Sequence, residues 1–263
     1  MKNNFSKAVV TGLVITIFLS SITSAQEQRQ ISVWQYRQVK PENTEEFIKR
    51  ETTYWSEVAK KALDKGNLTF WALLQRVGGY DLENSSNFIF INTYNDIDAI
   101  GNIWSEDAVK AAFPNVPMNK IETGTLSKTT SVFFLHAMGW QQVEKAVPAN
   151  DFKFIKLNYI TSSAPGNLIE LENKHWAPFI KKAMESGQTT QKAWGNAIVL
   201  SPRSQEINAN SVSYDLYPNL KEALYPKWDE KTVLPNDGLT EIGKLELIRR
   251  GEVVYRIVKV VSK

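Results

Sequence analysis

The feature that most constrains this chain is an internal repeat. The segment 51–66 reads ETTYWSEVAKKALDKG, and the segment 172–187 reads ENKHWAPFIKKAMESG. Both begin with Glu, have Trp four residues later, continue through Lys-Lys-Ala and end with Gly, at an offset of 172 − 51 = 121 residues. A strand-like pattern at 31–39 is followed by a similar one at 152–160, at the same offset. The sequence therefore predicts two copies of one folding unit in tandem.

The first 25 residues have the pattern of a secretory signal peptide. Lys2 and Lys7 give a positive start, residues 8–19 are apolar, and residues 23–25 (TSA) are small enough for cleavage. The alternative is an uncleaved membrane anchor, but the apolar run is short for a bilayer span. We expect the signal to be removed and the mature protein to be periplasmic or secreted.

Composition excludes several classes of function. The chain has no cysteine, which excludes disulfides, thiol nucleophiles, thiolate metal sites and lipidated cysteines. The net charge of +3 becomes 3 − 2 = +1 without the two lysines of the signal, and acids and bases are interspersed. A nucleic-acid partner is therefore not expected, nor is a membrane partner after signal cleavage. P-loop, GxGxxG, GxSxG and HExxH motifs are missing from the sequence, so nucleotide folds, serine esterases and zinc proteases lack support.

Each copy is predicted to have the order strand, helix, strand, strand, helix, strand. The first repeat is assigned to 26–143 and the second to 144–263, with 141–151 as the linker. In the first copy the predicted strands are 31–39, 69–77, 88–94 and 130–140, and the helices are 44–65 and 96–104. In the second copy the strands are 152–160, 190–199, 211–217 and 252–261, the first helix follows residue 160, and the second is 220–228.

This order is that of a ferredoxin-like unit, an antiparallel sheet with both helices on one face. Two such units on one chain can cover each other's bare sheet. The arrangement resembles the dimeric α+β barrel superfamily, which includes antibiotic-biosynthesis-monooxygenase-like, NIPSNAP-like and chlorite-dismutase-like proteins. The predicted fold class is thus α+β: two tandem ferredoxin-like βαββαβ repeats packed sheet to sheet as an intrachain dimeric α+β barrel. The resemblance implies ligands between helices and sheet, with cofactor-free oxygenation, isomerisation or haem chemistry there.

Each repeat places a glutamate on the helix face that is expected to meet the sheet. At helical spacing, Glu51 shares a stripe with Tyr54 and Trp55, and Trp176 follows Glu172 in the same way. A buried carboxylate must find hydrogen-bond donors, a cation or a proton. Two interpretations remain open: a structural carboxylate that accepts bonds from neighbours, or a functional one in a pocket shaped by these aromatic residues.

The two histidines distinguish the repeats. His175 follows Glu172 by three residues, so both side chains could reach one ligand, and by resemblance Glu172 would be a general acid/base with His175 as its partner. The alternatives are a partly buried His bonded to Glu172 or backbone, and a haem ligand. A di-metal centre is not expected with two histidines. His136 corresponds to 136 + 121 = 257, which is Ile257, so the fold does not require histidine there.

Alternation in the first strand of each repeat separates two faces. Trp34 and Tyr36 share the face that is expected to pack against the helices, as do their counterparts Ile155 and Leu157. The opposite face, expected between the two sheets, carries the polar residues Gln35, Arg37, Lys156 and Asn158. These four could line a cavity for an anionic or carbonyl-bearing ligand, or form a polar network that bridges the halves.

Three functional hypotheses follow. The first is an exported protein that binds a small apolar or aromatic molecule between helices and sheet, with cofactor-independent oxygenase or isomerase chemistry. The second is a non-catalytic binding or interaction module, and the third is a haem-binding protein that uses His175. The candidate catalytic residues are Glu172 and His175, and the candidate ligand-binding residues are Glu51, Tyr54, Trp55, Trp176, His136, Arg37, Lys156 and Asn158. No metal ion is expected, and a monomer or a homo-oligomer fits the duplication.

Overall fold

The computed structural model describes residues 30–78, 85–203 and 209–262. The predicted signal peptide lies outside the described residues. No helix within these ranges combines the length and the apolar character that crossing a membrane requires.

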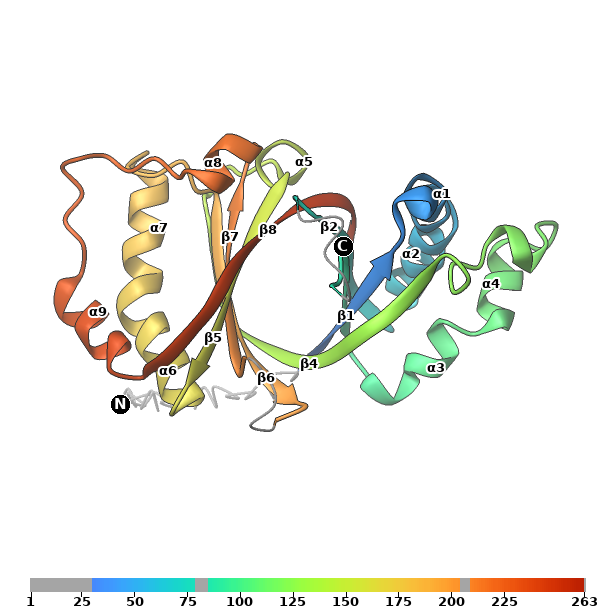
Figure 1. Cartoon of the computed structure of the whole chain (residues 1–263), viewed down its shortest axis with the longest axis horizontal. Helices are drawn as coiled ribbons and strands as arrows, with labels where there is room; N and C mark the ends of the chain where they lie inside the picture. The colour runs from blue at the N-terminus through green and yellow to red at the C-terminus, as the bar shows by residue number, and fades with distance from the viewer. Residues whose placement is uncertain (1–29, 79–84, 204–208, 263) are drawn as a thin grey trace, which may run out of the picture.

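The strands form one closed antiparallel barrel (Figure 1). The N-terminal half contributes β1 (Ile31–Val39), β2 (Leu68–Arg76), β3 (Phe88–Tyr94) and β4 (Ser127–Gln142). The C-terminal half contributes β5 (Phe154–Ser162), β6 (Ala193–Ser201), β7 (Ser211–Tyr217) and β8 (Glu246–Ser262). The order around the barrel is β1-β3-β2-β8-β5-β7-β6-β4, so each half keeps the ferredoxin-like strand order.

The longest strands join the halves. β4 pairs with β1 of its own half and with β6 of the other, and β8 pairs with β5 and with β2. In Figure 1 both strands cross the middle of the molecule. Because every sheet edge is paired, the barrel has no free edge at the junction. The predicted α+β barrel of tandem ferredoxin-like halves is confirmed.

Helices cover the two outer ends of the barrel (Figure 1). On the N-terminal half these are η1 (Pro41–Asn43), α1 (Thr44–Arg50), the π-helical turn η2 (Glu51–Trp55), α2 (Ser56–Asp64), η3 (Ile97–Ala99), α3 (Ile100–Ile103), α4 (Glu106–Ala112) and η4 (Met118–Lys120). On the C-terminal half they are α6 (Pro165–Leu171), the π-helical turn η5 (Glu172–Trp176), α7 (Ala177–Glu185), α8 (Leu220–Leu224) and α9 (Asn236–Gly243). The short α5 (Pro148–Asp151) lies in the linker.

The expected orientation of the first strands is wrong. Trp34, Tyr36 and Leu157 belong to the apolar cluster that fills the barrel and contains residues of both halves. Val33 and Val39, on the opposite face of β1, pack with helix residues instead. Both faces of these strands carry apolar residues, so alternation separates the faces without telling which one meets the helices. The polar residues of this second face therefore lie between helices and sheet, not between the two sheets.

Equivalent residues of the two halves are separated by three different sequence offsets rather than by one. The helical turns keep the offset of 121, but the strands do not. Asn87 bonds the N–H and C=O of Val39, and Asn210 bonds those of Ser162 in the same way, which gives 210 − 87 = 123. Arg37 therefore corresponds to 37 + 123 = 160, the apolar Ile160, rather than to Asn158.

The last strands follow a third offset. Gln35 pairs with Val132, and its counterpart Asn158 pairs with Glu252, which gives 252 − 132 = 120. Val132 thus corresponds to Glu252, and His136 corresponds to Arg256 and not to Ile257. Loops of unequal length between the elements account for the change, because only the packed elements must keep their places.

Several boundaries also differ from the prediction. The helix expected at 44–65 is interrupted by η2, the helix expected at 96–104 consists of η3 and α3, and α4 follows it outside the predicted range. The predicted helix 220–228 is shorter, ending at Leu224, and α9 forms in a segment for which no helix was predicted. The buried Ile242 of α9 packs with Leu168, which explains why a helix forms over this polar, glycine-containing segment.

Candidate functional site

A π-helical turn sets the direction of the key glutamate in each half. The N–H of Ser56 donates to the C=O of Glu51, five residues earlier, and Ala177 donates to Glu172 in the same way. Such a turn is wider than an α-turn and carries residue i+3 further round the axis from residue i. As a result, Glu51 lines a cavity together with Trp55, whereas Tyr54 packs edge-on against Phe113 outside that lining.

The first cavity lies between this turn and the sheet of the N-terminal half and has a volume of about 270 Å³. Its walls are mostly aromatic and aliphatic, with a small polar group. The apolar lining is Val33, Trp55, Trp71, Phe90, Tyr94, Ile100 and Trp104, and the polar lining is Gln35, Arg37, Glu51, Asn92 and Thr123. Apolar walls with a few convergent polar groups are typical of a small-molecule site.

Glu51 is the central polar group of the first cavity. Its side chain is 4% exposed, and Oε1 accepts a hydrogen bond of 2.6 Å from the Thr123 hydroxyl. Burial raises the pKa of Glu51 to about 7, against the opposing effects of the Thr123 bond and the Arg37 charge. Among the described residues, Oε2 has no hydrogen-bond partner. The carboxyl can therefore gain or lose a proton near neutral pH.

Arg37 supplies the positive charge of this cavity. Its Nε and Nη2 donate to Ser127 Oγ at 3.2 and 2.5 Å, and its Nη1 donates to Gln35 Oε1 at 3.2 Å. Ser127 in turn donates to the backbone carbonyl of Thr123 at 2.9 Å. Burial lowers the pKa of Arg37, and the Glu51 charge acts in the opposite direction. The guanidinium remains cationic, because its ordinary pKa is above 12.

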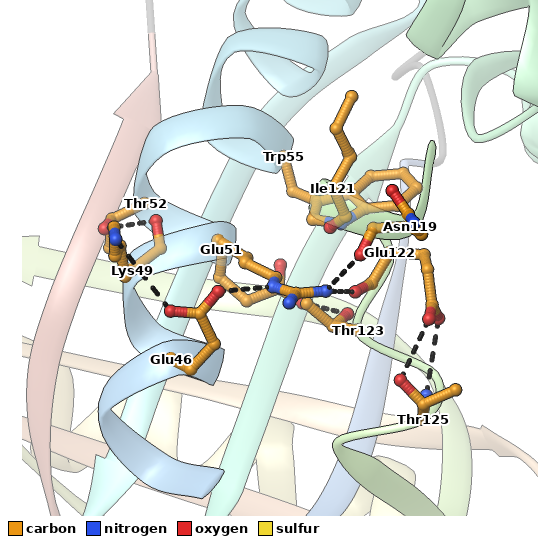
Figure 2. A network of polar contacts seen from close by, with 11 residues as sticks. Glu46, Lys49, Glu51, Thr52, Trp55, Asn119, Ile121, Glu122, Thr123 and Thr125 are labelled. Carbon is orange, nitrogen blue, oxygen red and sulfur yellow. Dashed lines mark hydrogen bonds and ion pairs between the residues drawn. The ribbon is translucent and has the colours of Figure 1, made fainter. Parts of the chain in front are cut away.

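The segment that carries Thr123 is held by the neighbouring helix (Figure 2). Arg50 of α1 donates through Nη1 to the carbonyls of Asn119 and Glu122, at 2.9 and 2.7 Å, while its Nε bonds Glu46. The Trp55 indole donates to the Ile121 carbonyl at 3.1 Å. These bonds fix the backbone on both sides of Thr123 and so place its hydroxyl against Glu51.

Aromatic side chains in contact with one another line the first cavity. The indole of Trp104 lies 6.2 Å from that of Trp55 and donates to the Tyr94 hydroxyl at 2.7 Å. Burial raises the pKa of Tyr94 to about 12, so this hydroxyl stays protonated. Flat aromatic surfaces on several sides favour a planar ligand.

A second cavity occupies the corresponding place in the C-terminal half, with a volume of about 510 Å³. It is richer in charge: Asp215 stands where the first half has Asn92, Lys156 where it has Val33, and Glu252 where it has Val132. Asn158 and Gln191 each donate to one oxygen of Asp215, at 3.0 and 2.8 Å. Burial raises the pKa of Asp215 to about 6. Lys156 forms an ion pair of 3.5 Å with Glu252.

Glu172 lies in the lining of the second cavity with Trp176, in surroundings unlike those of Glu51. Its Oε2 accepts from Asn196 at 2.9 Å. The position of Arg37 is taken by Ile160, which packs among apolar residues. The recurring glutamate therefore has the same backbone position in both halves and different partners.

The structure separates the histidines from both cavities. His175 turns toward α9, where its Nε2 lies 3.4 Å from Glu241 and its ring faces Gly238, so it does not share a ligand position with Glu172. His136 contacts the backbone carbonyl of Gln30 at 3.0 Å. Neither residue belongs to the lining of either of these two cavities. The residues present thus do not fit haem ligation through His175.

Several site residues were missed by the sequence analysis. Thr123 lies in a loop with no periodic signal, and Trp104 lies at the end of the predicted helix 96–104, where nothing in the sequence indicated that it would face a cavity. Asn92 offered a signal that was not used, because it is a polar residue inside the apolar strand FIFINTY. Asp215 has the same position in the other half and the same kind of signal.

The barrel and the paired helix–sheet cavities define the class of this chain: it has the fold of the dimeric α+β barrel superfamily. Solved structures with this fold include a proposed monooxygenase from Lactobacillus acidophilus NCFM, with 10% identity, coverage of 89% of this chain and 96% of that one, and a TM-score of 0.56. An anthrone oxidase-like protein matches with 11% identity over 90% and 94% of the two chains, at a TM-score of 0.54. A proposed monooxygenase from Fusobacterium nucleatum has 11% identity, coverage of 89% and 94%, and a TM-score of 0.51.

Comparison of the sequence with known families and proteins does not identify a more specific family within this fold. No family model matches the chain, and no curated protein matches it. The likeness to solved structures is below 12% identity and describes the fold alone. Function must therefore be argued from the cavities.

Proposed function

We propose that this protein binds a small, planar, largely apolar molecule in the first cavity and that Glu51 exchanges a proton with it. One observation carries the proposal: a buried carboxyl with a pKa of about 7 lines an aromatic-walled cavity, and one of its oxygens has no partner among the described residues. A base whose pKa is near the working pH is best suited to proton transfer.

The chemistry suits an acidic C–H next to a carbonyl group. The Glu51 carboxylate takes the proton, and the C–H electrons move into the C–C=O system to give an enolate. Arg37 lines the same cavity and stabilises this negative charge. Return of the proton to a different carbon completes an isomerisation, and attack of the enolate carbon on dioxygen would begin an oxygenation without a cofactor.

The names of the structural relatives agree with this reading without establishing it. Two are described as proposed monooxygenases and one as anthrone oxidase-like. Anthrone is a planar aromatic ketone with an acidic C–H, so it has the shape and the acidity that the first cavity suits.

We also propose, on the signal-peptide pattern of residues 1–25, that the protein acts outside the cytoplasm. The mass of the exported protein would locate the cleavage site.

The test uses 2-tetralone, a bicyclic ketone with acidic α-protons. Exchange of these protons in D₂O is followed by proton NMR with and without the protein. We expect exchange to be accelerated, with a rate that rises with pH through about 7, because the carboxylate is the active form. Glu51→Gln should reduce the acceleration by at least about 100-fold.

The duplication supplies the control. Glu172→Gln removes the corresponding carboxyl from the second cavity and should leave exchange nearly unchanged. If both variants lost the acceleration of exchange equally, proton transfer would not be specific to the first cavity, and the proposal would be contradicted. Tight binding of 2-tetralone without any exchange would identify a binding module in place of a proton-transfer enzyme.

A further inference from the structure

The first cavity contains a polar group that the protein itself does not satisfy. Asn92 of β3 is 8% exposed and lies in the cavity lining. Its Oδ1 is buried and has no hydrogen-bond partner among the described residues. Buried polar groups are normally paired, so an orphan that lines a cavity needs an explanation.

The other half shows that the fold can satisfy this position. Asp215 lies at 215 − 92 = 123, and both of its oxygens are occupied by the side-chain amides of Asn158 and Gln191. At 158 − 123 = 35 the first half has Gln35, whose Oε1 accepts from Arg37 and whose Nε2 does not bond to Asn92 Oδ1. At 191 − 123 = 68 it has Leu68, which offers no donor.

An unpaired amide oxygen at this strand position is therefore specific to the first half. Two residues away on the same strand, Phe90 stands where the second half has Ser213 at 90 + 123, so this face of the strand is more apolar in the first cavity. In such surroundings a missing hydrogen bond is costly, and a ligand that supplies it gains correspondingly in affinity.

We infer that Asn92 is a specificity-determining residue and that the natural ligand carries a neutral hydroxyl or N–H group that bonds to its amide. This inference rests on the proposed function of the first cavity and names the substrate class more closely: a planar ketone with a phenolic hydroxyl. A hydroxyl can donate to Oδ1 and accept from Nδ2, so it suits either orientation of the amide. A carboxylate at this point would leave Oδ1 unpaired.

Binding is measured with five ketones and three proteins. Dissociation constants for 2-tetralone and for its 5-, 6-, 7- and 8-hydroxy derivatives are determined by calorimetry with the wild type, Asn92→Leu and Ser213→Ala. For at least one isomer the wild type should bind the hydroxylated ketone roughly tenfold more tightly than 2-tetralone itself. Asn92→Leu should abolish this gain while keeping the affinity for 2-tetralone within about twofold, and Ser213→Ala, in the second cavity, should preserve it.

The unliganded protein gives a second readout. Leu in place of an unsatisfied buried amide removes an unpaired group, so Asn92→Leu should raise the Tm by about 2–4 °C. A lower Tm would show that the amide is paired in solution and would overturn the inference.

The possible results distinguish a failure of this inference from a failure of the proposed function. If 2-tetralone binds but no hydroxyl isomer gains affinity, or if the gain survives Asn92→Leu, the role of Asn92 is refuted and the proposed function stands. If none of the ketones binds to the wild type, the proposed function fails and this inference fails with it.

Discussion

At the scale of single residues, Glu51 and Glu172 show how surroundings decide the chemistry of one side chain. Both are buried at the same position of a π-helical turn. Glu51 has a hydroxyl donor in Thr123 and the charge of Arg37 in its cavity, whereas Glu172 accepts from the amide of Asn196. The candidate base is thus defined by residues far from it in sequence, not by the repeated motif.

The raised pKa of Glu51 predicts a pH-dependent stability. Burial raises this pKa from 4.5 to about 7, so the folded protein holds the proton more tightly than the unfolded chain does. The resulting stabilisation is complete below pH 4.5 and is lost as the pH rises through about 7. Between pH 5 and 8 the unfolding free energy of the wild type should fall by roughly 2–3 kcal/mol relative to Glu51→Gln.

Urea unfolding at both pH values measures this difference. Other titrating groups, Asp215 included, are present in both proteins and cancel in the comparison. Glu57→Gln, which changes an exposed glutamate of α2, is the control and should follow the wild type at both pH values. A gap between wild type and Glu51→Gln that does not change with pH would contradict the raised pKa.

At the scale of elements, the π-helical turn determines which side chains face each cavity. It brings Glu51 and Trp55 to the cavity and leaves Tyr54 outside, and in the other half it leaves His175 facing α9. Helical spacing in the sequence assumes an α-helix throughout, so it placed both residues on the wrong side. Recurrence of this turn in both halves indicates that it belongs to the fold.

Removing one residue from this turn should convert it to α-helix. Deletion of the exposed Thr53 is expected to keep the fold but to rotate Glu51 relative to Trp55, because an α-turn needs one residue fewer than a π-turn. We predict at least a tenfold loss of 2-tetralone affinity, measured by quenching of tryptophan fluorescence. Deletion of Lys174, at 53 + 121, makes the same change in the second half and should leave the first cavity intact. Equal effects of the two deletions would contradict this role of the turn.

At the scale of the whole molecule, the halves share one core and cannot be treated as separate domains. The cluster inside the barrel combines Trp34 and Tyr36 with Leu157, and the hydroxyl groups of Tyr36 and Tyr159 are 3.0 Å apart. Hydrogen bonds along β4 and β8 add to this shared core. We therefore expect the two halves to unfold together.

A cavity made in one half should destabilise both. Leu157→Ala removes a fully buried side chain from the barrel cluster and should cost about 2–5 kcal/mol. Calorimetry should show a single transition at a lower temperature, and hydrogen exchange should increase in strands of both halves. Val233→Ala, at a side chain that is 83% exposed, is the control and should change stability by less than about 0.5 kcal/mol. Two separate transitions would show that the halves fold independently.

The sequence by itself determined the duplication, the order of elements in each half and, through these, the barrel. It also placed Glu51 and Glu172 at the junction of helix and sheet, because helical periodicity and the repeat are local properties. It could not decide which face of β1 meets the helices, since Trp34 and Val33 are both apolar and only the packing of the whole barrel separates them.

Tertiary structure alone decided what surrounds each glutamate. Thr123 reaches Glu51 from 72 residues away, and Arg37 joins the same cavity from a strand whose orientation the barrel imposes. It also left Asn92 Oδ1 without a hydrogen-bond partner among the described residues, while its counterpart Asp215 has two. Hydrogen bonds between distant segments depend on loop lengths and strand register, and these are set by the packed fold, not by local pattern.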